Sequence, residues 1–560
     1  MANDLTYAIV EVGGIQNYIL STGKLREMIG GSQLIEDLSK GILERECKAL
    51  NLDLIEPQNA TEPTGNKVLA LQRNAGEIHL LFSSREIAKK FISHFIFKIS
   101  SDYPGIPLFG ALNDEEHNCT WTDKDSYRQC RASAQKGITK LRNNAPVNTG
   151  MSMLPLCQMA GLDGLPAVDR IGDDFISVCS KSRQSRDLLE AADERLRQRF
   201  ETVLPSEVKV IWTDDIEELA GSGDKIAYIH IDGNDLGKLF RSFLESDDYK
   251  NLNVQDSIKA MADLSKLVES STRKAMDEGL KAIMSYEYEV KVWQEKGRNK
   301  LVVPARPLVQ GGDDVTIVMR ADLALLFISR FVNTFEKEAV CKLSNKEIQL
   351  SVGAGMVICQ KGYPFIRAFN LSEELLKNAK ELTKDEAVRP SSLDYLVITN
   401  EVENDLELIR HHIAKTADKK TMLTAKPLIL SHNNLHDFVD KGLMVLNKLP
   451  RSTVRPALNQ CRKGKDESKS AFETLERNIR RELGGRKDSN LMSPDEFKSV
   501  FPDNSFFTTV HKEIAGKSVE ATYVGDWLEL AHLLPNYHDE RSYSVRVERY
   551  LALLKDGEEK

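Results

Sequence analysis

The chain has 560 residues, enough for roughly three to five domains of ordinary size. Hydrophobic residues make up 41% and charged residues 29%, a globular composition that excludes a fibrous or largely disordered chain. The net charge of −8 excludes a protein that is basic throughout, so contacts with nucleic acid must come from local patches or partner subunits.

Membrane, secretion and disulfide signals are not seen in the sequence. No apolar run approaches the roughly 18–20 residues that span a bilayer, and the first residues do not read as a secretion signal. The eight cysteines are dispersed and never form Cys-x-x-Cys. We therefore expect a cytoplasmic protein without membrane contact, disulfide framework or structural zinc.

An internal duplication is the clearest large-scale feature. Residues 7–20 read YAIVEVGGIQNYIL and residues 227–240 read AYIHIDGNDLGKLF, each an apolar strand, a glycine turn and the start of a helix. Farther along, residues 76–99 match residues 312–335 without gaps, including a shared Phe-Ile-Ser-x-Phe. Strand-to-helix units resemble one another in any α/β protein, but the same order and comparable separation of the two pairs favour a duplication.

The duplication predicts two related α+β units, at residues 1–140 and 223–400. Between them, residues 141–222 are irregular at first and then charged and helical. From residue 401 to 560, mixed-charge stretches such as SKSAFETLERNIRREL predict a helical C-terminal domain.

The sharpest candidate site is VQGGDDVTIV, residues 309–318. Gly311 and Gly312 fit a tight β-hairpin, because glycine tolerates the positive φ of the tightest turns. Asp313 and Asp314 repel each other unless a cation neutralises them, and such oxygen-rich sites suit Mg²⁺ or Mn²⁺. Taken alone, the segment favours an ordinary Gly-Gly-Asp turn on the surface over a metal site.

The earlier segment IHIDGNDLGKLF strengthens the metal interpretation. Asp232 ends an apolar strand, and Gly233 and Gly237 flank the turn into a helix. Glycines at such a turn let backbone N–H groups and the helix N-terminus approach triphosphate oxygens. Three carboxylates on two neighbouring strands are the parts of a two-metal site for nucleotidyl transfer.

In these two motifs the chain resembles the palm domain of the large subunit of type III CRISPR effector complexes (Csm/Cmr type), which is similar to GGDEF diguanylate cyclases and class III adenylyl cyclases. The opening VGGIQNYILSTGKLREMIGGSQLI resembles the start of that subunit's first palm. Residues 351–358 (SVGAGMVI) and 371–381 (LSEELLKNAKE) resemble the strand and lysine-bearing helix after its Gly-Gly-Asp-Asp. The resemblance implies an α+β fold: two tandem ferredoxin-like palm domains with a helical inter-palm region and a helical C-terminal domain.

The resemblance also implies a catalytic site. Asp232 and Asp313 would bind two Mg²⁺ or Mn²⁺ ions beside the Gly233 carbonyl, and Asp314 would be a third ligand or would orient an attacking 3′-hydroxyl. Lys380 would contact a triphosphate, unless it is a solvated helix lysine. The residues implied to bind nucleotide are Gly233, Asn234, Gly237, Gly311, Gly312, Lys380, Gly30, Gly31 and Ser32; the last three would support a second nucleotide, unless Gly-Gly-Ser only ends a helix.

The implied reaction joins ATP molecules. A 3′-hydroxyl attacks an α-phosphate, pyrophosphate leaves, and cyclic oligoadenylate results. The ungapped matches place Val12 where Asp232 stands and Ile78 where Asp314 stands, so that only Glu77 keeps a carboxylate. We therefore expect the first palm to bind no catalytic metal and to complete the nucleotide pocket across an intramolecular pseudo-dimer.

The sequence departs from the family in two places. Many members begin with an HD nuclease domain, but here the first palm starts by residue 7, and His436-Asp437 and His538-Asp539 have no convincing partners, so we expect no DNA cleavage. In LCQMAGLDGLPAV, Cys157 stands where a zinc-binding Cys-x-x-Cys would start, but Ala160 takes its second position and Cys179 is isolated, so we expect no zinc.

A basic run at residues 462–487 contains Arg480, Arg481, Arg486 and Lys487. It is compatible with a contact to RNA phosphate or a partner, and also with a solvated amphipathic helix.

Three functions are compatible with these observations. The chain is a cyclic oligoadenylate synthase within a type III complex, with effector subunits, CRISPR RNA and target RNA as partners; or a stand-alone palm-type cyclase in antiphage signalling without guide RNA; or a non-catalytic nucleotide-binding scaffold. Retention of Asp232, Asp313 and Asp314 argues against the scaffold, because a scaffold has no use for clustered charges that need a metal.

Overall fold

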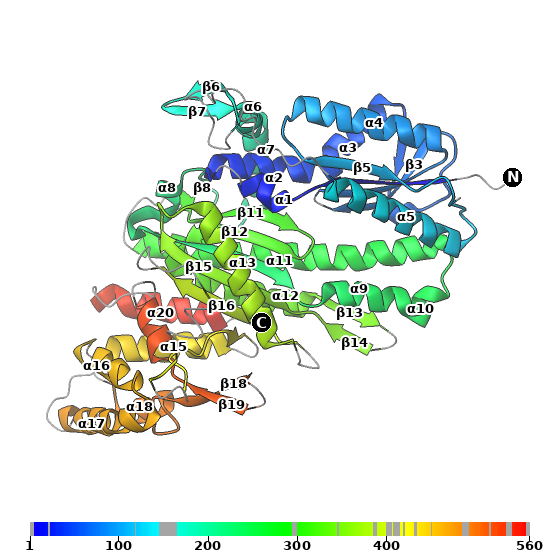
Figure 1. The fold of residues 1–560 in the computed structure, drawn as a ribbon. Helices are drawn as coiled ribbons and strands as arrows, with labels where there is room; N and C mark the ends of the chain where they lie inside the picture. The colour runs from blue at the N-terminus through cyan, green and yellow to red at the C-terminus, as the bar shows by residue number, and fades with distance from the viewer. Residues whose placement is uncertain are drawn as a thin grey trace.

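The structure is a computed structural model. It describes residues 5–20, 23–74, 76–117, 119–144, 165–293, 299–343, 346–384, 389–398, 406, 415–417, 421–430, 434–449, 451–483, 492–514, 517–531, 533 and 540–555. Figure 1 shows the first palm (blue) above the second palm (green), with the C-terminal domain (yellow to red) below. None of the helices described is both long and apolar enough to cross a membrane.

The first palm is built on a five-stranded sheet in the order β2-β3-β4-β1-β5. Its strand β1 is buried on both faces, because Ala8 and Val10 pack into one hydrophobic core and Tyr7 and Ile9 into another. The helix α4 contributes to the first of these cores and α5 to the second. The elements are β1 (Thr6–Val12), α1 (Ile15–Leu20), α2 (Leu25–Asp37), the π-helix η1 (Leu38–Ile42), α3 (Leu43–Ala49), β2 (Asp53–Ile55), η2 (Pro57–Asn59), β3 (Lys67–Asn74), β4 (Glu77–Phe82), α4 (Arg85–Asp102), β5 (Leu108–Leu112) and α5 (Lys124–Asn143).

The second palm has a six-stranded sheet in the order β11-β12-β9-β15-β16-β17. Its strands β11, β12, β9 and β15 follow one another as β3, β4, β1 and β5 do in the first palm, so the duplication is confirmed at the level of strand order. The elements are β9 (Lys225–Gly233), α9 (Leu236–Glu245), α10 (Asp247–Lys250), α11 (Val254–Trp293), β10 (Lys300–Val303), β11 (Ala305–Gly311), β12 (Asp314–Arg320), η4 (Ala321–Leu323), α12 (Ala324–Glu338), β13 (Val340–Leu343), β14 (Lys346–Gln349), β15 (Val352–Gln360), α13 (Phe365–Leu382), β16 (Ser392–Val397) and β17 (Leu428–Ile429).

The register of the two sheets corrects the residue equivalences of the ungapped matches. In the second palm, Ile231 pairs with Val315. Their counterparts in the matches are Glu11 and His79, yet Glu11 pairs with Glu77 in the first palm. The match of residues 7–20 with 227–240 and the match of residues 76–99 with 312–335 therefore disagree by two residues in strand register. They cannot both be structural equivalences.

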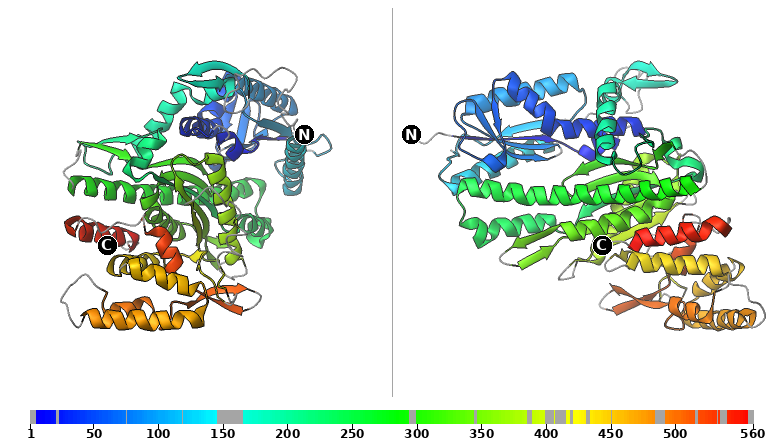
Figure 2. Two further views of the ribbon diagram at one scale, coloured as in Figure 1. Left: turned by 60° about the vertical axis from the view of Figure 1, so that its left-hand side comes forward. Right: turned by 180° about the vertical axis from the view of Figure 1, so that it is seen from behind.

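One continuous hydrophobic core joins the two palms. Tyr228, Val318 and Val357 of the second palm belong to the same core as Ala8 and Val10 of the first. The long helix α11 runs beside both palms (Figure 2), and its residues Val254 and Ile258 pack under the first palm. The expected tandem arrangement is confirmed, and the two palms meet face to face rather than as separate bodies.

The inter-palm region contains a feature that its irregular sequence did not predict. Residues 145–164, with Cys157 and Ala160, lie outside the described residues; after them comes a hairpin, β6 (Ala167–Ile171) and β7 (Asp174–Ser177). The predicted charged helix is present as α7 (Arg186–Phe200), preceded by α6 (Val178–Arg183) and followed by β8 (Lys209–Trp212), α8 (Ile216–Ala220) and η3 (Gly221–Gly223). β8 pairs in parallel with β10 of the second palm.

The C-terminal domain is mainly helical, as expected, with one added hairpin. Its helix α20 returns to the second palm, where Ser329 Oγ donates to the Leu554 carbonyl at 3.0 Å and Tyr550 Oη donates to the Asp322 carbonyl at 3.1 Å. The elements are α15 (Asn434–Lys448), α16 (Arg451–Cys461), α17 (Lys465–Leu483), α18 (Pro494–Val500), β18 (Thr508–Ile514), β19 (Lys517–Ala521), α19 (Val524–Leu530) and α20 (Glu540–Lys555).

The basic run forms the amphipathic helix α17. Phe472 and Leu475 are buried on one side, while Arg480 and Arg481 are exposed on the other. Arg480 donates to Glu476 at 2.7 Å. This is the pattern of a solvated amphipathic helix over its described part; Arg486 and Lys487 lie outside the described residues.

Candidate active site between the two palms

The Gly-Gly-Asp-Asp segment forms the predicted hairpin. Gln310 pairs with Val315 and Gly311 with Asp314. Gly312 has a φ of +60°, a conformation that favours glycine over residues with a Cβ. The turn thus holds Asp313 at the hairpin tip.

Asp232 and Asp313 are brought together, as expected. β12 lies beside β9 in the sheet, and Asp232 is close enough for its negative charge to act on the carboxyl group of Asp313. A Cβ on Gly233 would lie 2.9 Å from Asp313 Oδ2 and 2.4 Å from Leu236 Cδ1. Gly233 is therefore needed for the carboxyl of Asp313 to approach β9 so closely.

Burial and repulsion act on this pair. Burial, and then the negative charge of Asp232, raise the pKa of Asp313 to about 7 from its ordinary value of 3.8. The carboxyl group of Asp313 therefore keeps its proton to a higher pH than an ordinary aspartate does. A divalent cation would neutralise the same charge, so the chemistry of the pair suits Mg²⁺ or Mn²⁺.

Lys380 is ion-paired rather than solvated. Its Nζ donates to Asp232 Oδ2 at 2.5 Å and to the Gly233 carbonyl at 2.7 Å, and its side chain is only 22% exposed. A Cβ on Gly353 would lie 2.7 Å from Lys380 Cγ, so the glycine of β15 leaves a path for the lysine stem. The interpretation of Lys380 as a solvated helix lysine was wrong.

The carboxylate of Asp314 has hydrogen-bond partners of its own. Its Oδ1 lies 2.8 Å from His230 Nε2, and its Oδ2 accepts a hydrogen bond at 2.9 Å from Gln16 Nε2 of the first palm. Whether Asp314 is a third metal ligand or orients the attacking hydroxyl stays a prediction, while Asp232, Asp313 and the Gly233 carbonyl lie together.

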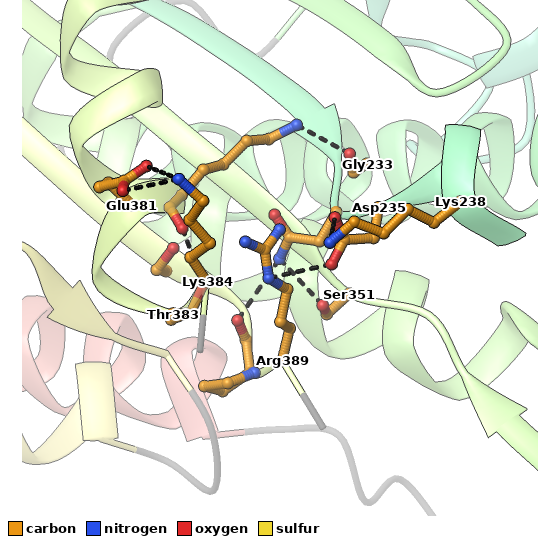
Figure 3. Close-up of polar contacts among 12 residues, drawn as sticks. Gly233, Asp235, Lys238, Ser351, Glu381, Thr383, Lys384 and Arg389 are labelled. Atoms are coloured by element: carbon orange, nitrogen blue, oxygen red, sulfur yellow. Dashed lines mark hydrogen bonds and ion pairs between the residues drawn. The ribbon is translucent and has the colours of Figure 1, made fainter. Parts of the chain in front are cut away.

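A cluster of cations lies next to Gly233, and the sequence motifs did not single it out (Figure 3). Asp235 has a φ of +55°, in the left-handed region. Its carboxylate lies 3.1 Å from Lys238 Nζ and 3.0 Å from Arg389 Nε. Lys384 donates to Glu381 at 2.9 Å nearby. Strained backbone of this kind clusters at functional sites. In the sequence, Lys238 within GNDLGK was the signal that could have indicated this cluster.

Asn234 has a supporting position rather than an open one. Its side chain is 6% exposed, and Nδ2 donates to Ser351 Oγ at 2.9 Å. It therefore fastens the loop after β9 to the residue before β15. Gly237, in contrast, has open space where a side chain would stand.

A cavity of about 440 Å³ lies between the palms and reaches the hairpin tip. It is lined by Gly311, Gly312, Asp313 and Asp314 of the second palm and by residues of the first palm and α7, among them Glu11, Ser32, Glu77, Arg142, Arg195 and Arg199. The pseudo-dimer therefore encloses a cavity at the expected place.

The first palm presents three carboxylates to this cavity, Glu11, Glu36 and Glu77, where one was expected. Glu11 and Glu77 are register partners on β1 and β4. Glu11 pairs with Arg142 at 2.8 Å, and Glu77 lies 2.7 Å from His79 Nε2. The His79 hydrogen bond lowers the pKa of Glu77. Glu36 pairs with Lys40 and Arg195, so all three acids already have partners.

Gly30 and Gly31 serve packing. Both are buried inside α2, so the interpretation that Gly-Gly-Ser ends a helix was wrong. A Cβ on Gly30 would lie 1.7 Å from the Arg183 carbonyl oxygen, so the glycine lets α6 dock on α2. Of the three predicted residues, Ser32 lines the cavity.

Other metal sites are not seen in the part of the chain that the structure describes. Within those ranges, no group of three or more His, Cys, Asp or Glu side chains is placed to hold a metal ion. His436 Nδ1 lies 3.3 Å from Asp437 Oδ1 as an exposed pair, and Cys179 is buried against Gly105. His538 and Asp539 lie outside the described residues.

Comparisons with known proteins find a family model and solved structures. The model of the second palm domain of Cas10/Cmr2 matches residues 225–388. The chain is similar to Csm1 of T. onnurineus (13% identity, TM-score 0.41, covering 99% of this chain and 69% of that chain). It is also similar to chains in the apo Csm1–Csm4 cassette (11%, 0.44, 99% and 70%) and in that cassette with cA4 (12%, 0.39, 75% and 56%).

No curated protein matches the sequence. The chain covers 56% of the length of the chain it matches in the cA4 complex. The family match includes β9, the Gly-Gly-Asp-Asp hairpin and the whole of α13. Over residues 225–388, which contain Asp232, Asp313 and Lys380, this chain matches the second palm domain of Cas10/Cmr2.

Proposed function

We propose that the chain is a metal-dependent nucleotidyltransferase that joins ATP into cyclic oligoadenylate, as the large subunit of an RNA-guided type III CRISPR complex. The observation that carries the proposal is the close pair of Asp232 and Asp313, with the ammonium of Lys380 beside it and the inter-palm cavity next to it. The match of residues 225–388 to a Cas10/Cmr2 palm supports the same conclusion.

Asp232, Asp313 and the Gly233 carbonyl would hold Mg²⁺ or Mn²⁺. Such an ion stabilises negative charge on a transferring phosphoryl group and orients it. Lys380 now neutralises Asp232; with a cation between the carboxylates, its ammonium is free to contact a triphosphate. The cations Lys238 and Arg389 flank the same glycine turn and add positive charge where phosphates would lie.

Asp314 fits the role of orienting the attacking hydroxyl better than that of a metal ligand. It faces the inter-palm cavity, and Gln16 and His230 hold its carboxylate in one orientation. A 3′-hydroxyl in the cavity would donate to this carboxylate and attack the α-phosphate of a second ATP, and pyrophosphate would leave. Positioning of this kind supplies much of the rate in phosphoryl transfer.

The test is incubation of the purified chain with ATP and Mg²⁺ or Mn²⁺, with chromatography for oligoadenylates. Asp313→Ala combined with Asp314→Ala is expected to abolish the product while the circular dichroism spectrum persists. Asp263→Ala, on the exposed surface of α11, is the matched control and should keep full activity. Undiminished product from the double variant would remove both acids from the mechanism.

A second comparison tests the assembly. The assay is repeated with and without co-purified effector subunits, CRISPR RNA and target RNA. Product that depends on target RNA supports the complex. Equal product from the isolated chain would instead identify a stand-alone cyclase.

A further inference from the structure

A second cavity, of about 360 Å³, adjoins the Gly-Gly-Asp-Asp hairpin. It shares Asn74, Arg195, Arg199 and residues 310–312 with the inter-palm cavity. Asp313 and Asp314 line the inter-palm cavity but not this one. The two cavities therefore meet at the hairpin tip, and the second lies on the side away from the carboxylates.

Five cations from four elements line this second cavity, which we call the basic recess. They come from η1, the end of β3, α7 and α11: Lys40, Arg73, Arg195, Arg199 and Arg273. Arg195 and Arg199 are four residues apart on α7, so they lie on the same face of the helix. Two carboxylates, Glu36 and Glu269, line the recess as well. The lining thus carries an excess of positive charge.

The carboxylates of the recess do not satisfy its cations. Glu36 is shared, because it pairs both with Lys40 at 2.8 Å and with Arg195. Arg199 pairs with Asp277 and donates to Gln310 at 3.2 Å.

The hydrogen-bonding capacity of the recess arginines is not fully used within the protein. The Nε atoms of Arg195 and Arg199 are buried without a hydrogen-bond partner among the described residues. Within the same described ranges, exposed Arg273 makes no ion pair closer than 4 Å. Arg73, by contrast, pairs with Glu44 and Glu56, and its Nε donates to the Ser39 carbonyl at 2.8 Å. Its guanidinium group therefore already has partners within the protein.

Burial and the proximity of other cations lower the pKa values of two groups in the recess. Burial first, and then repulsion from Arg199 and Arg306, lower the pKa of Arg195 to about 10. Burial also lowers the pKa of Lys40; the charge of Glu269 opposes that shift and Arg273 adds to it. Cations whose charged form is disfavoured in this way are stabilised when an anion enters.

We propose that the basic recess is a binding site for phosphate groups, adjoining the inter-palm cavity across the hairpin tip. Arginine clusters suit phosphate because their N–H groups pair with two oxygens at once. Two sources carry this chemistry: the pyrophosphate that the proposed reaction releases, and the phosphodiesters of an oligonucleotide product. The choice between pyrophosphate and an oligonucleotide rests on the proposed function. The proposal that the recess binds phosphate groups does not.

The test uses the full chain carrying Asp313→Ala and Asp314→Ala, in buffer with a chelator, so that neither catalysis nor divalent metal contributes. Titration calorimetry measures the affinity for inorganic pyrophosphate and, separately, for the 5′-phosphorylated diadenylate pApA. Lys40→Ala with Arg273→Ala, both at the exposed mouth, is added to this background. Lys274→Ala is the matched control, because it neighbours Arg273 on α11 but pairs with Glu338 instead.

Removal of the two mouth cations is expected to weaken pyrophosphate binding by about tenfold or more, since hydrogen bonds to charged groups are the strong ones. The Lys274 control should bind as the background does. Stronger binding of pApA than of pyrophosphate would identify an oligonucleotide as the source, and the reverse would identify the leaving group. Binding that is absent at millimolar pyrophosphate, or unchanged by the double mouth variant, would overturn the site whatever the ATP assay gives.

Discussion

Asp313→Asn tests the electrostatics of the carboxyl pair. In the folded chain the pKa of Asp313 is about 7, against 3.8 ordinarily. Because the folded pKa is the higher one, the folded chain keeps a proton that the unfolded chain has lost between about pH 4 and pH 7. The free energy of opening should therefore fall as the pH rises through this window and then level off. Asparagine cannot ionise, so the variant should escape this loss.

The magnitude follows from the two pKa values. A difference of about 3 pH units at about 1.4 kcal/mol each corresponds to at most about 4 kcal/mol above pH 7. Hydrogen exchange measured by mass spectrometry on β9 and β12 reports local opening of the second palm, which a global melt of a multi-domain chain would not isolate. Comparing wild type and variant at each pH cancels the intrinsic pH dependence of exchange.

We expect the protection of Asp313→Asn to exceed that of the metal-free wild type by a margin that grows from pH 4 to pH 7. Mn²⁺ should restore protection in the wild type alone, because the cation replaces the proton. Asp314→Asn is the matched control, since its carboxylate is already held by Gln16 and His230. A wild-type-to-variant margin equal at pH 5 and pH 8 would refute burial and repulsion as the cause.

Three further substitutions probe how the site is held. Gly353→Ala should lower oligoadenylate synthesis by at least about tenfold, because its Cβ would lie 2.7 Å from the stem of Lys380. Gln16→Leu should lower the turnover number with little change in KM for ATP, because it frees Asp314 from the first palm. Gly30→Ala should destabilise the chain by about 1–3 kcal/mol or more in thermal unfolding, since its Cβ would overlap the backbone of α6.

The controls for these substitutions are in the same elements or close to them. Gly41→Ala has nothing within 4 Å of the new Cβ and should leave the melting temperature close to that of the wild type. Gln16→Asn keeps the amide on a shorter side chain, so it tests whether the length of the side chain matters. Full turnover in Gln16→Leu would show that the contact between Gln16 and Asp314 is incidental. Unaltered synthesis in Gly353→Ala would show that Lys380 reaches Asp232 by another path.

Local sequence was sufficient for the fold and for the core of the site. The alternation of apolar residues in YAIVEV and AYIHID predicted β1 and β9, and the paired glycines predicted the tight turn that holds Asp313. These features depend on hydrophobic periodicity and on the φ of single residues, which a short segment contains within itself. The duplication was likewise visible, although its register was wrong by two residues because an ungapped match cannot detect which residues pair across a sheet.

Only the tertiary structure decided what each charged side chain contacts. It placed Lys380 against an acid 148 residues away and connected Gln16 to Asp314 across 298 residues. The basic recess likewise collects its cations from four separate elements. The energy of a charge depends on its burial and on neighbours within a few ångströms. Those neighbours come from distant parts of the chain, so the carboxyls, the ammonium and the arginines acquire their chemistry only when the two palms pack together.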